Sequence, residues 1–195
     1  MILGLTGFSG AGKSTVAALL IEQGFYHIDC DRLVHSHVYR DPAVLDALAD
    51  SFGPQILCGG KLNRKALRSQ TMGNPAALQK LNDTVMPFIL AHIHAELRAH
   101  AGEDIVLDAP LLFETGLDRE CDRVLSVITT PELAMARIIR RDGLTRAEAE
   151  KRLSSQHPPS YYVEKSDYVI VNNEELPALK EKTLELLKKI HDAAL

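Results

Sequence analysis

Cysteine is scarce in this sequence. The 195 residues include three cysteines, Cys30, Cys58 and Cys121, and none of them belongs to a C-x-x-C pair. A disulfide framework joins cysteines in pairs and so usually has an even number of them, and a zinc knuckle needs a C-x-x-C pair. We therefore expect reduced thiols and a fold that is stabilised by its hydrophobic core.

Long apolar runs and an excess of basic charge are also missing. The longest uninterrupted apolar run, Val85–Ala91, covers seven residues and is too short to cross a bilayer or to form the core of a signal peptide. The net charge of −4 provides no overall basic surface for nucleic-acid phosphates, although a local basic patch is compatible with it. We expect a cytoplasmic protein with no membrane, nucleic-acid or obligatory protein partner.

Short β-rich segments alternate with helical ones along the chain. The five β-rich segments are Ile2–Thr6, Tyr26–Asp29, Ile105–Asp108, Val124–Ile128 and Tyr168–Val171. Residues suited to a crossover helix follow each of them, which is the pattern of a parallel sheet in an α/β protein. With 46% hydrophobic residues, the chain can bury one substantial core. The pattern predicts a three-layer α/β sandwich around a five-stranded parallel sheet.

The segment between the second and third predicted strands is too long for a simple crossover. Asp41-Pro42 opens one helix, and residues 74–100 carry a second helical pattern that Pro87 should kink or split. We expect a helical insert at about residues 38–100, over the edge of the sheet, that holds an acceptor substrate.

A second segment has the composition of a mobile lid. Within residues 142–159, Thr145 and Glu148 form a capping box before a charged, alanine-rich helix, which Pro158-Pro159 should end. We expect one domain over residues 1–195, and its predicted parts are a core at about 1–37, 101–141 and 160–195, the insert at 38–100 and the lid at 142–159.

The strongest motif lies directly after the first predicted strand. Residues Gly7–Thr15 read G-F-S-G-A-G-K-S-T and fit the phosphate-loop pattern G-x-x-x-x-G-K-[ST]. Glycines allow backbone N–H groups to close on phosphate oxygens, and the following helix, which should begin near Lys13 and stop before Gly24, adds partial positive charge. A glycine-rich turn with an incidental lysine is the alternative, and the strand-loop-helix context disfavours it.

This motif predicts a P-loop NTPase fold that binds ATP and Mg²⁺. Lys13 should reach the β- and γ-phosphates, and the hydroxyl of Ser14 should ligate the metal. The loop residues expected to contact the nucleotide are Gly10, Ala11, Gly12, Lys13, Ser14 and Thr15.

Carboxylates follow two other predicted strands, at the edge of the sheet where the phosphate loop lies. Asp31 follows the second strand, where it either acts on an acceptor hydroxyl or caps the next helix, and its spacing supports both roles equally. Asp108 ends the third strand, where P-loop proteins place a second carboxylate near the metal. A capping role is the alternative for Asp108, and we favour the metal.

Arginines precede the lid. Arg137, Arg140 and Arg141 lie on the predicted helix that leads into it, where a guanidinium group can bind phosphate oxygens in a bidentate manner. The sequence Asp50–Gly53 has the D-x-x-G form of GTPases, but no strand precedes it and no N-K-x-D follows. The motifs therefore favour a kinase over a GTPase.

With these motifs in place, the chain resembles the dephospho-coenzyme A kinases nearly from end to end. The matching stretches are L-T-G-F-S-G-A-G-K-S-T at Leu5–Thr15, I-D-C-D at Ile28–Asp31, L-D-A-P-L-L-F-E at Leu107–Glu114, R-I-I-R-R-D-G at Arg137–Gly143, Gln156, and D-Y-V-I-V-N-N at Asp167–Asn173. Together they are far more specific than the phosphate loop alone. The resemblance implies transfer of the ATP γ-phosphate to the 3′-hydroxyl of the dephospho-CoA ribose, the last step of coenzyme A biosynthesis.

The resemblance also implies roles for individual residues. It makes Asp31 the catalytic carboxylate, with Lys13 and Arg141 as further catalytic residues. Arg137 and Asn173 would join the loop in binding ATP. The residues that would hold the CoA moiety, besides the insert, are Asp31, Pro110, Leu111 and Glu114. Ser14 and Asp108 would serve the metal.

Two stretches depart from the family pattern. Met86-Pro87-Phe88 stands where the family commonly has His-Pro-Leu, and residues 157–163, H-P-P-S-Y-Y-V, replace a stretch that usually contains Arg or Lys. Both stretches should contact the acceptor or close the lid, so the departures bear on acceptor handling and leave the phosphate machinery unchanged.

Overall fold

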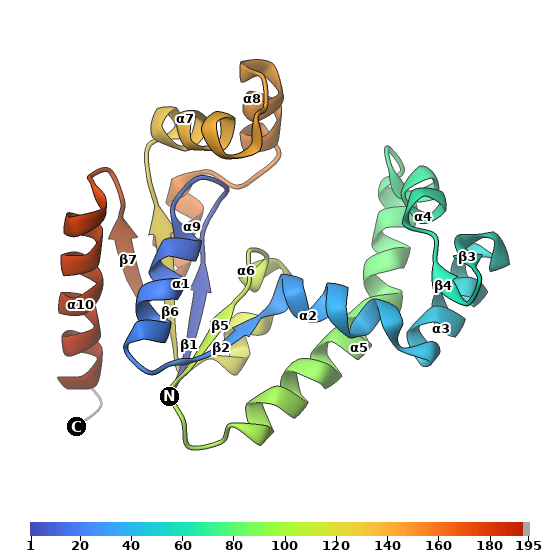
Figure 1. Ribbon diagram of the computed structural model, residues 1–195, viewed down its shortest axis with the longest axis horizontal. Coiled ribbons are helices and arrows are strands. Elements are labelled where there is room, and N and C mark those ends of the chain that lie inside the picture. Colours follow the sequence, from blue (N-terminus) through green and yellow to red (C-terminus); the bar gives the residue numbers. More distant parts are fainter. Residues whose placement is uncertain (193–195) are drawn as a thin grey trace. The chain divides into compact units, whose positions relative to one another are not determined.

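The main sheet of the protein has five strands (Figure 1). The computed structural model describes residues 1–192, apart from the side chains of His35 and His191. The strands are β1 (Ile2–Thr6), β2 (Tyr26–Asp29), β5 (Ile105–Asp108), β6 (Arg123–Ile128) and β7 (Tyr168–Val171). Their order is β2-β5-β1-β6-β7, and β1 pairs in parallel with both β5 and β6. The predicted parallel sheet is confirmed, and only β6 differs from its predicted bounds, by one residue at its start.

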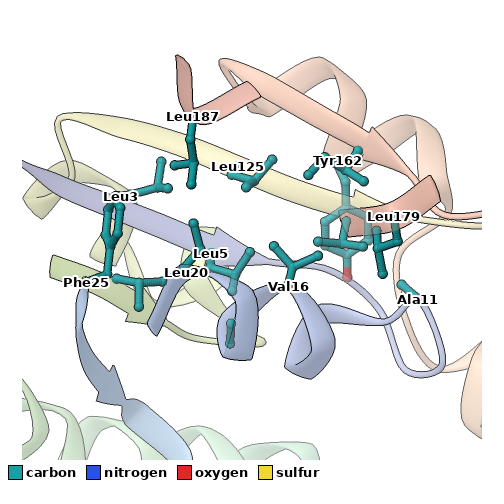
Figure 2. Packing of buried hydrophobic residues seen from close by; sticks show 14 of the residues in the cluster. Leu3, Leu5, Ala11, Val16, Leu20, Phe25, Leu125, Tyr162, Leu179 and Leu187 are labelled. Atoms are coloured by element: carbon teal, nitrogen blue, oxygen red, sulfur yellow. The ribbon is translucent and has the colours of Figure 1, made fainter. Parts of the chain in front are cut away.

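The alternation of side chains in β1 places helices on both faces of the sheet. Leu3 and Leu5 share one face, and Figure 2 shows Leu5 beside Leu20 of α1 (Lys13–Glu22). Gly4 faces the other way, where an added Cβ would come within 3.0 Å of Leu112. Leu3, Leu5 and Leu20 are fully buried, and each contributes about 1.5–3 kcal/mol by leaving water.

Helix α1 has the predicted bounds, since it begins at Lys13 and ends before Gly24. Its inner face is apolar, and Val16, Ala17 and Leu20 belong to the main hydrophobic cluster together with Leu125 of β6 (Figure 2). The strand-loop-helix arrangement that a phosphate loop requires is therefore present.

The chain divides into two compact units. The sheet unit is Met1–His27 with Gly102–Leu195, and the helical unit is Ile28–Ala101. After β5, the helices of the sheet unit are α6 (Leu112–Thr115), the 3₁₀ helix η3 (Leu117–Glu120), α7 (Pro131–Asp142), α8 (Arg146–Ser154), α9 (Pro159–Lys165) and α10 (Leu176–Asp192).

The predicted capping box of α8 is confirmed. The hydroxyl of Thr145 accepts a hydrogen bond from the Glu148 amide at 3.3 Å, and the Glu148 carboxylate accepts one from the Thr145 amide at 2.8 Å. The prediction that Pro158-Pro159 ends the lid helix is wrong, because α8 ends at Ser154 and Pro159 begins α9. Proline is well suited to a first helical position, where its fixed φ is helical and its missing N–H would have no partner.

The helical unit contains α2 (Cys30–Ser36), the 3₁₀ helix η1 (Val38–Arg40), α3 (Pro42–Phe52), the 3₁₀ helix η2 (Pro54–Ile56), the hairpin strands β3 (Leu57–Cys58) and β4 (Lys61–Leu62), α4 (Arg64–Thr71) and α5 (Pro75–Ala99). Helix α3 starts at Pro42 after the cap Asp41, as predicted. Helix α5 continues through Pro87 as a single helix whose ribbon changes direction along its length (Figure 1). Within residues 1–192, no helix is both long enough and apolar enough to cross a membrane.

Candidate active site

The phosphate loop joins β1 to α1, and its neighbours leave no room for side chains at its glycines. A Cβ on Gly10 would lie 2.6 Å from the Ala134 carbonyl oxygen, and a Cβ on Gly12 would lie 2.2 Å from the side-chain nitrogen Nδ2 of Asn172. Gly12 is also the N-cap of α1 and has a φ of 102°, a backbone conformation that residues with a side chain rarely adopt. The backbone of the loop therefore packs directly against α7 and the segment after β7.

The start of α1 provides amide groups for an anion. The amides of Thr15 and Val16 donate hydrogen bonds to the Gly12 carbonyl, at 3.0 and 3.2 Å. The amides of Lys13 and Ser14 precede them, in the part of a helix where N–H groups have no partner within the helix. Such amides and the positive end of the helix dipole favour a phosphate group at this position.

Lys13 and Asp108, which the sequence predicts separately, form an ion pair. Asp108 is 6% exposed at the end of β5 and lies in register with Leu5 of β1. Lys13 Nζ pairs with Asp108 Oδ1, and His27 Nε2 lies 3.4 Å from Asp108 Oδ2. Because a buried carboxylate needs compensating partners, these two contacts account for the burial of Asp108.

His27 was not singled out by the sequence. It lies inside a predicted strand, where nothing distinguishes it from a residue that fills space, and only the pairing order of the strands brings it to Asp108. The position of His27 on the strand next to that of Asp108 could have been predicted only if the strand order had been known.

The predicted magnesium residues have the right chemistry for that ion. Ser14 is exposed in the first turn of α1, and Asp108 supplies a carboxylate from the end of the strand beside β1. Among residues 1–192, no group of three or more His, Cys, Asp or Glu side chains could hold a metal by itself. Magnesium commonly uses one or two protein oxygens and completes its shell with substrate phosphates and water. A hydroxyl and a carboxylate therefore fit magnesium that arrives with a nucleotide.

Two side chains brace the phosphate loop from outside. Arg137 of α7 donates to the Gly10 carbonyl at 3.3 Å, and Asn172 donates from its amide to the Ala11 carbonyl at 2.8 Å. Asn172 is 6% exposed, so this hydrogen bond is shielded from water. Asn172 belongs to the matching stretch Asp167–Asn173, of which only Asn173 is predicted to bind ATP, but Asn172 is the member that contacts the loop.

Asn173, which was predicted to bind ATP, holds the segment between β6 and α7. Its side-chain oxygen accepts hydrogen bonds from the Thr129 hydroxyl at 3.0 Å and from the Thr130 amide at 3.2 Å. Asn173 is itself exposed. The structure thus gives this residue a definite supporting contact, and its role toward the nucleotide stays a prediction.

Arg141 lies at the end of α7, where the lid begins. Its Nε and Nη2 donate to the two carboxylate oxygens of Asp142, at 2.7 and 2.9 Å, and Arg152 of α8 pairs with the same carboxylate. The hydrogen bonds from Arg141, followed by those from Arg152, lower the pKa of Asp142 to about 2. The bidentate face of Arg141 is therefore engaged within the lid and would have to leave Asp142 to bind a phosphate in the same manner.

The predicted acceptor turn follows β5. The carbonyl of Pro110 accepts a hydrogen bond from the Thr6 hydroxyl at 3.3 Å, which ties the turn to the end of β1. Leu111 exposes 59% of its surface, and Glu114 Oε1 lies 3.3 Å from His157 Nε2 of the segment after α8.

The stretch that departs from the family pattern after Gln156 has a structural role. Gln156 accepts a hydrogen bond from the Ser9 amide of the phosphate loop at 3.0 Å. His157 stacks on Tyr161, with ring centroids 3.8 Å apart, and Tyr162 is 3% exposed beside Phe8. This stretch therefore fastens α9 to the core and to the phosphate loop.

Asp31 lies in the first turn of α2, in the helical unit, and its side chain is exposed. The cap of this helix is Asp29, whose carboxylate accepts a hydrogen bond from the Arg32 amide at 2.9 Å. The alternative that Asp31 serves as the N-cap is therefore wrong.

The similarity of this chain to known proteins extends over nearly its whole length. A family model described as dephospho-CoA kinase matches residues 1–178. The chain belongs to the dephospho-CoA kinase family. It is 37% identical to the dephospho-CoA kinase of Fusobacterium nucleatum over 184 residues, which cover 93% of this chain and 94% of that protein. It is 36% identical to the dephospho-CoA kinase of Latilactobacillus sakei over 191 residues, which cover 96% and 95%.

Solved structures confirm the fold of this family member. TT1252 from Thermus thermophilus superimposes with a TM-score of 0.82 at 31% identity, over 97% of each chain. The dephospho-CoA kinase from Campylobacter jejuni gives 0.74 at 24% identity, over 100% of this chain and 98% of that one. A shikimate kinase from Bacteroides thetaiotaomicron gives 0.58 at 12% identity, over 98% of each chain. The predicted P-loop kinase fold and the resemblance to dephospho-CoA kinases are both confirmed, and the chain is a kinase.

Proposed function

We propose that this kinase transfers the γ-phosphoryl group of ATP to the 3′-hydroxyl of dephospho-CoA and so completes coenzyme A, in the cytoplasm. The observation that carries the proposal is the phosphate loop whose Lys13 pairs with the buried Asp108, in a chain that matches the family model over residues 1–178.

In this proposal the sheet unit binds ATP. The amides of residues 10–15 and the Lys13 ammonium surround the phosphates, while Arg137 and Asn173 lie around the nucleotide and Ser14 and Asp108 hold Mg²⁺. When bound there, magnesium would supply positive charge that offsets the negative charge developing on the phosphates. Lys13 already pairs with a carboxylate, that of Asp108. It can exchange this partner for a phosphate, so that its positive charge faces a negative group throughout.

The proposed acceptor residues are Asp31, Pro110, Leu111 and Glu114, together with the insert at about residues 38–100. Asp31 orients the 3′-hydroxyl or takes its proton, since transfer to a hydroxyl benefits from a carboxylate beside the attacking oxygen. Lys13, the loop amides and Arg141 share the negative charge of the transferred group.

The lid at about residues 142–159 closes over the phosphates in this proposal. Closure excludes water and so suppresses ATP hydrolysis. Arg141 then exchanges its two hydrogen bonds to Asp142 for phosphate oxygens, which offer the same bidentate geometry.

The decisive test uses ATP, Mg²⁺ and a panel of acceptors. Mass spectrometry of the product should show 3′-phosphorylated coenzyme A from dephospho-CoA and no comparable product from nucleoside monophosphates or shikimate. Phosphorylation of a nucleoside monophosphate in place of dephospho-CoA would refute the proposal and make the chain a nucleotide kinase. ATP binding without any product would indicate a regulatory nucleotide-binding protein.

The role of Asp31 has its own test. Asp31→Asn should lower turnover by about 10²–10⁴-fold, the usual contribution of a positioned base, and should leave ATP affinity within about twofold. Asp29→Asn is the matched control, because it keeps a capping oxygen at the start of the same helix. Turnover in Asp31→Asn that equals the wild type would remove Asp31 from the mechanism.

A further inference from the structure

The carboxylate of Asp108 has one partner on each of its oxygens. Lys13 Nζ pairs with Oδ1, and His27 Nε2 lies 3.4 Å from Oδ2, the distance of a long hydrogen bond. The Asp108 side chain is 8% exposed, so water contributes little to its orientation. All three residues belong to the sheet unit, and the two partners therefore decide how this carboxylate is turned.

The chemistry of the acceptor fixes the direction of the hydrogen bond from His27. An ionised carboxylate has no proton to donate, so the proton between the two groups is on Nε2 of the imidazole. A neutral imidazole with its N–H at Nε2 can make this hydrogen bond. The contact therefore requires no positive charge on His27.

The pairing of β2 holds His27 at this position. Strand β2 lies beside β5 in the sheet, and the amide of Tyr26 donates to the Asp104 carbonyl at 2.8 Å. With its backbone fixed in this way, His27 has two side-chain torsions to order, whereas Lys13 has four. The contact from His27 is therefore the less costly of the two to maintain in conformational entropy.

Nucleotide binding affects the two partners of Asp108 differently. In the proposed function, Lys13 exchanges Asp108 for the phosphates of ATP, which frees Oδ1. His27 contacts the other oxygen from a paired strand and has no part in that exchange. The carboxylate therefore keeps a fixed Oδ2 while Oδ1 changes its partner.

We propose that His27 is a positioning residue for Asp108: its hydrogen bond to Oδ2 turns Oδ1 toward the cation beside the phosphate loop, which is Lys13 in this structure and Mg²⁺ once nucleotide is bound. The inference rests on the proposed function, in which Asp108 serves the metal. Partners that hydrogen-bond a metal-binding carboxylate typically account for about 10–100-fold in metal affinity. His27 lies just before the stretch Ile28–Asp31, so this support is outside the motifs by which the chain resembles its family.

The test is the factor by which saturating Mg²⁺ tightens the binding of a non-hydrolysable ATP analogue. This factor is the Kd in EDTA divided by the Kd in Mg²⁺, both measured by titration calorimetry without an acceptor. His27→Phe keeps a ring that suits a strand and removes the donor, so the factor should fall about tenfold. His27→Gln retains an N–H donor at a similar reach, and its factor should stay within about threefold of the wild type.

Other roles for His27 make different predictions. Loss of packing would lower the Tm of the ligand-free protein and weaken analogue binding equally with and without Mg²⁺, which leaves the factor unchanged. Charge compensation alone would make Mg²⁺ more valuable to Asp108 once the imidazole is gone, so the factor would rise. Only a positioning role lowers the factor in His27→Phe and restores it in His27→Gln.

Asp108→Asn supplies the reference. It removes the charge that attracts the metal, and it should lower the factor at least as much as His27→Phe does. In the double variant, His27→Phe should cause no further loss, because His27 acts through Asp108. His27→Leu, which is smaller and also lacks a donor, repeats the measurement if the phenyl ring unfolds the protein. A factor in His27→Phe or His27→Leu that equals or exceeds the wild-type value overturns the inference, as does an additive loss in the double variant.

These outcomes are distinct from failure of the proposed function. Wild-type protein that makes no 3′-phosphorylated product from dephospho-CoA refutes the proposed function, and the binding measurements still decide the role of His27. Normal product formation with an unchanged factor in His27→Phe refutes the inference alone. An unchanged factor in Asp108→Asn refutes the metal role of both residues and leaves the acceptor assay to decide the reaction.

Discussion

At the scale of single residues, Gly12 is constrained by conformation and by contact. Its φ of 102° is unfavourable for any residue with a side chain, and an added Cβ would lie 2.2 Å from Asn172 Nδ2. Asn172 in turn holds the Ala11 carbonyl. A methyl group at position 12 would therefore displace the side chain that shapes the phosphate loop.

Gly12→Ala should lower ATP affinity by at least tenfold, since it both strains the backbone and displaces Asn172. The strain alone costs about 1–2 kcal/mol of unfolding free energy. Gly24→Ala is the control, because Gly24 has a φ of 94° and no atom within 4 Å of an added Cβ. Chemical denaturation should show the larger destabilisation in Gly12→Ala, because the clash with Asn172 adds to the strain that both variants share. Calorimetry should show weakened ATP binding only in Gly12→Ala. Equal ATP affinity in the two variants would contradict the role assigned to Asn172.

Asp142 carries a second prediction at this scale. Hydrogen bonds from Arg141 and Arg152 lower its pKa to about 2 from an ordinary value of 3.8. A depressed folded-state pKa means that the ion pair stabilises the folded lid above about pH 4 and that this contribution is lost as the pH falls toward 2. In an NMR titration of the side-chain carboxyl carbon, Asp142 should titrate near pH 2.

The same titration in two variants tests the cause of the shift. Arg141→Gln should raise the apparent pKa of Asp142 more than Arg152→Gln, because the Arg141 hydrogen bonds are the largest contribution. A larger effect of Arg152→Gln would mean that Arg141 is free to bind phosphate without leaving Asp142.

At the scale of elements, helix α8 depends on its capping box. Thr145 and Glu148 satisfy each other's backbone amides at the exposed start of the helix, and α8 buries only Ala149. A helix with so little buried surface gains a large part of its stability from the cap.

Thr145→Ala should destabilise α8 by about 1 kcal/mol, the usual cost of losing an N-cap hydroxyl. Hydrogen exchange followed by mass spectrometry should show amides of α8 exchanging about fivefold faster, while β5 and β6 keep their rates. Ser154→Ala removes a hydroxyl from the other end of α8, where it bonds only the Lys151 carbonyl, and should have little effect. Unchanged exchange in Thr145→Ala would show that packing, and not the cap, holds the helix.

Other elements show which sequence signals are decisive. The starts of α1 and α3 and the cap of α8 were predicted because they depend on local chemistry, namely a glycine turn, Asp-Pro and a capping box. The hairpin of β3 and β4 was missed, although Gly59-Gly60 between the two strands is a recognised turn signal. Strands of two residues have no periodicity that could reveal them.

At the scale of the whole molecule, nucleotide binding should be visible as a gain in stability. A ligand that binds only the folded protein raises the free energy of unfolding by about 2.7 kcal/mol at one hundred times its Kd. For a chain of this length, that gain corresponds to a rise in Tm of roughly 5–10 °C. We expect such a rise with Mg·ATP in a thermal unfolding scan.

Lys13→Met supplies the comparison for this experiment. The variant should lose most of the rise in Tm, because it lacks the ammonium group that binds the phosphates. Chelation of Mg²⁺ by EDTA should reduce the rise in Tm of the wild type. A rise of the same size in Lys13→Met would place the nucleotide away from the phosphate loop.

The sequence by itself determined the class of fold, the place of the phosphate loop and the family, because these depend on the spacing of neighbouring residues. The β-rich segments were readable as a parallel sheet, and the G-x-x-x-x-G-K-S motif needed only its strand and helix. The identity of Asp29 as the cap of α2 was decided by the structure, since two aspartates at that position look alike in sequence.

Only the tertiary structure decided which distant residues meet. The pairing of Lys13 with Asp108 and His27 depends on the strand order, and the bracing of Ala11 by Asn172 depends on where β7 ends. Contacts of this kind follow from packing between segments far apart in the chain, which no local pattern records.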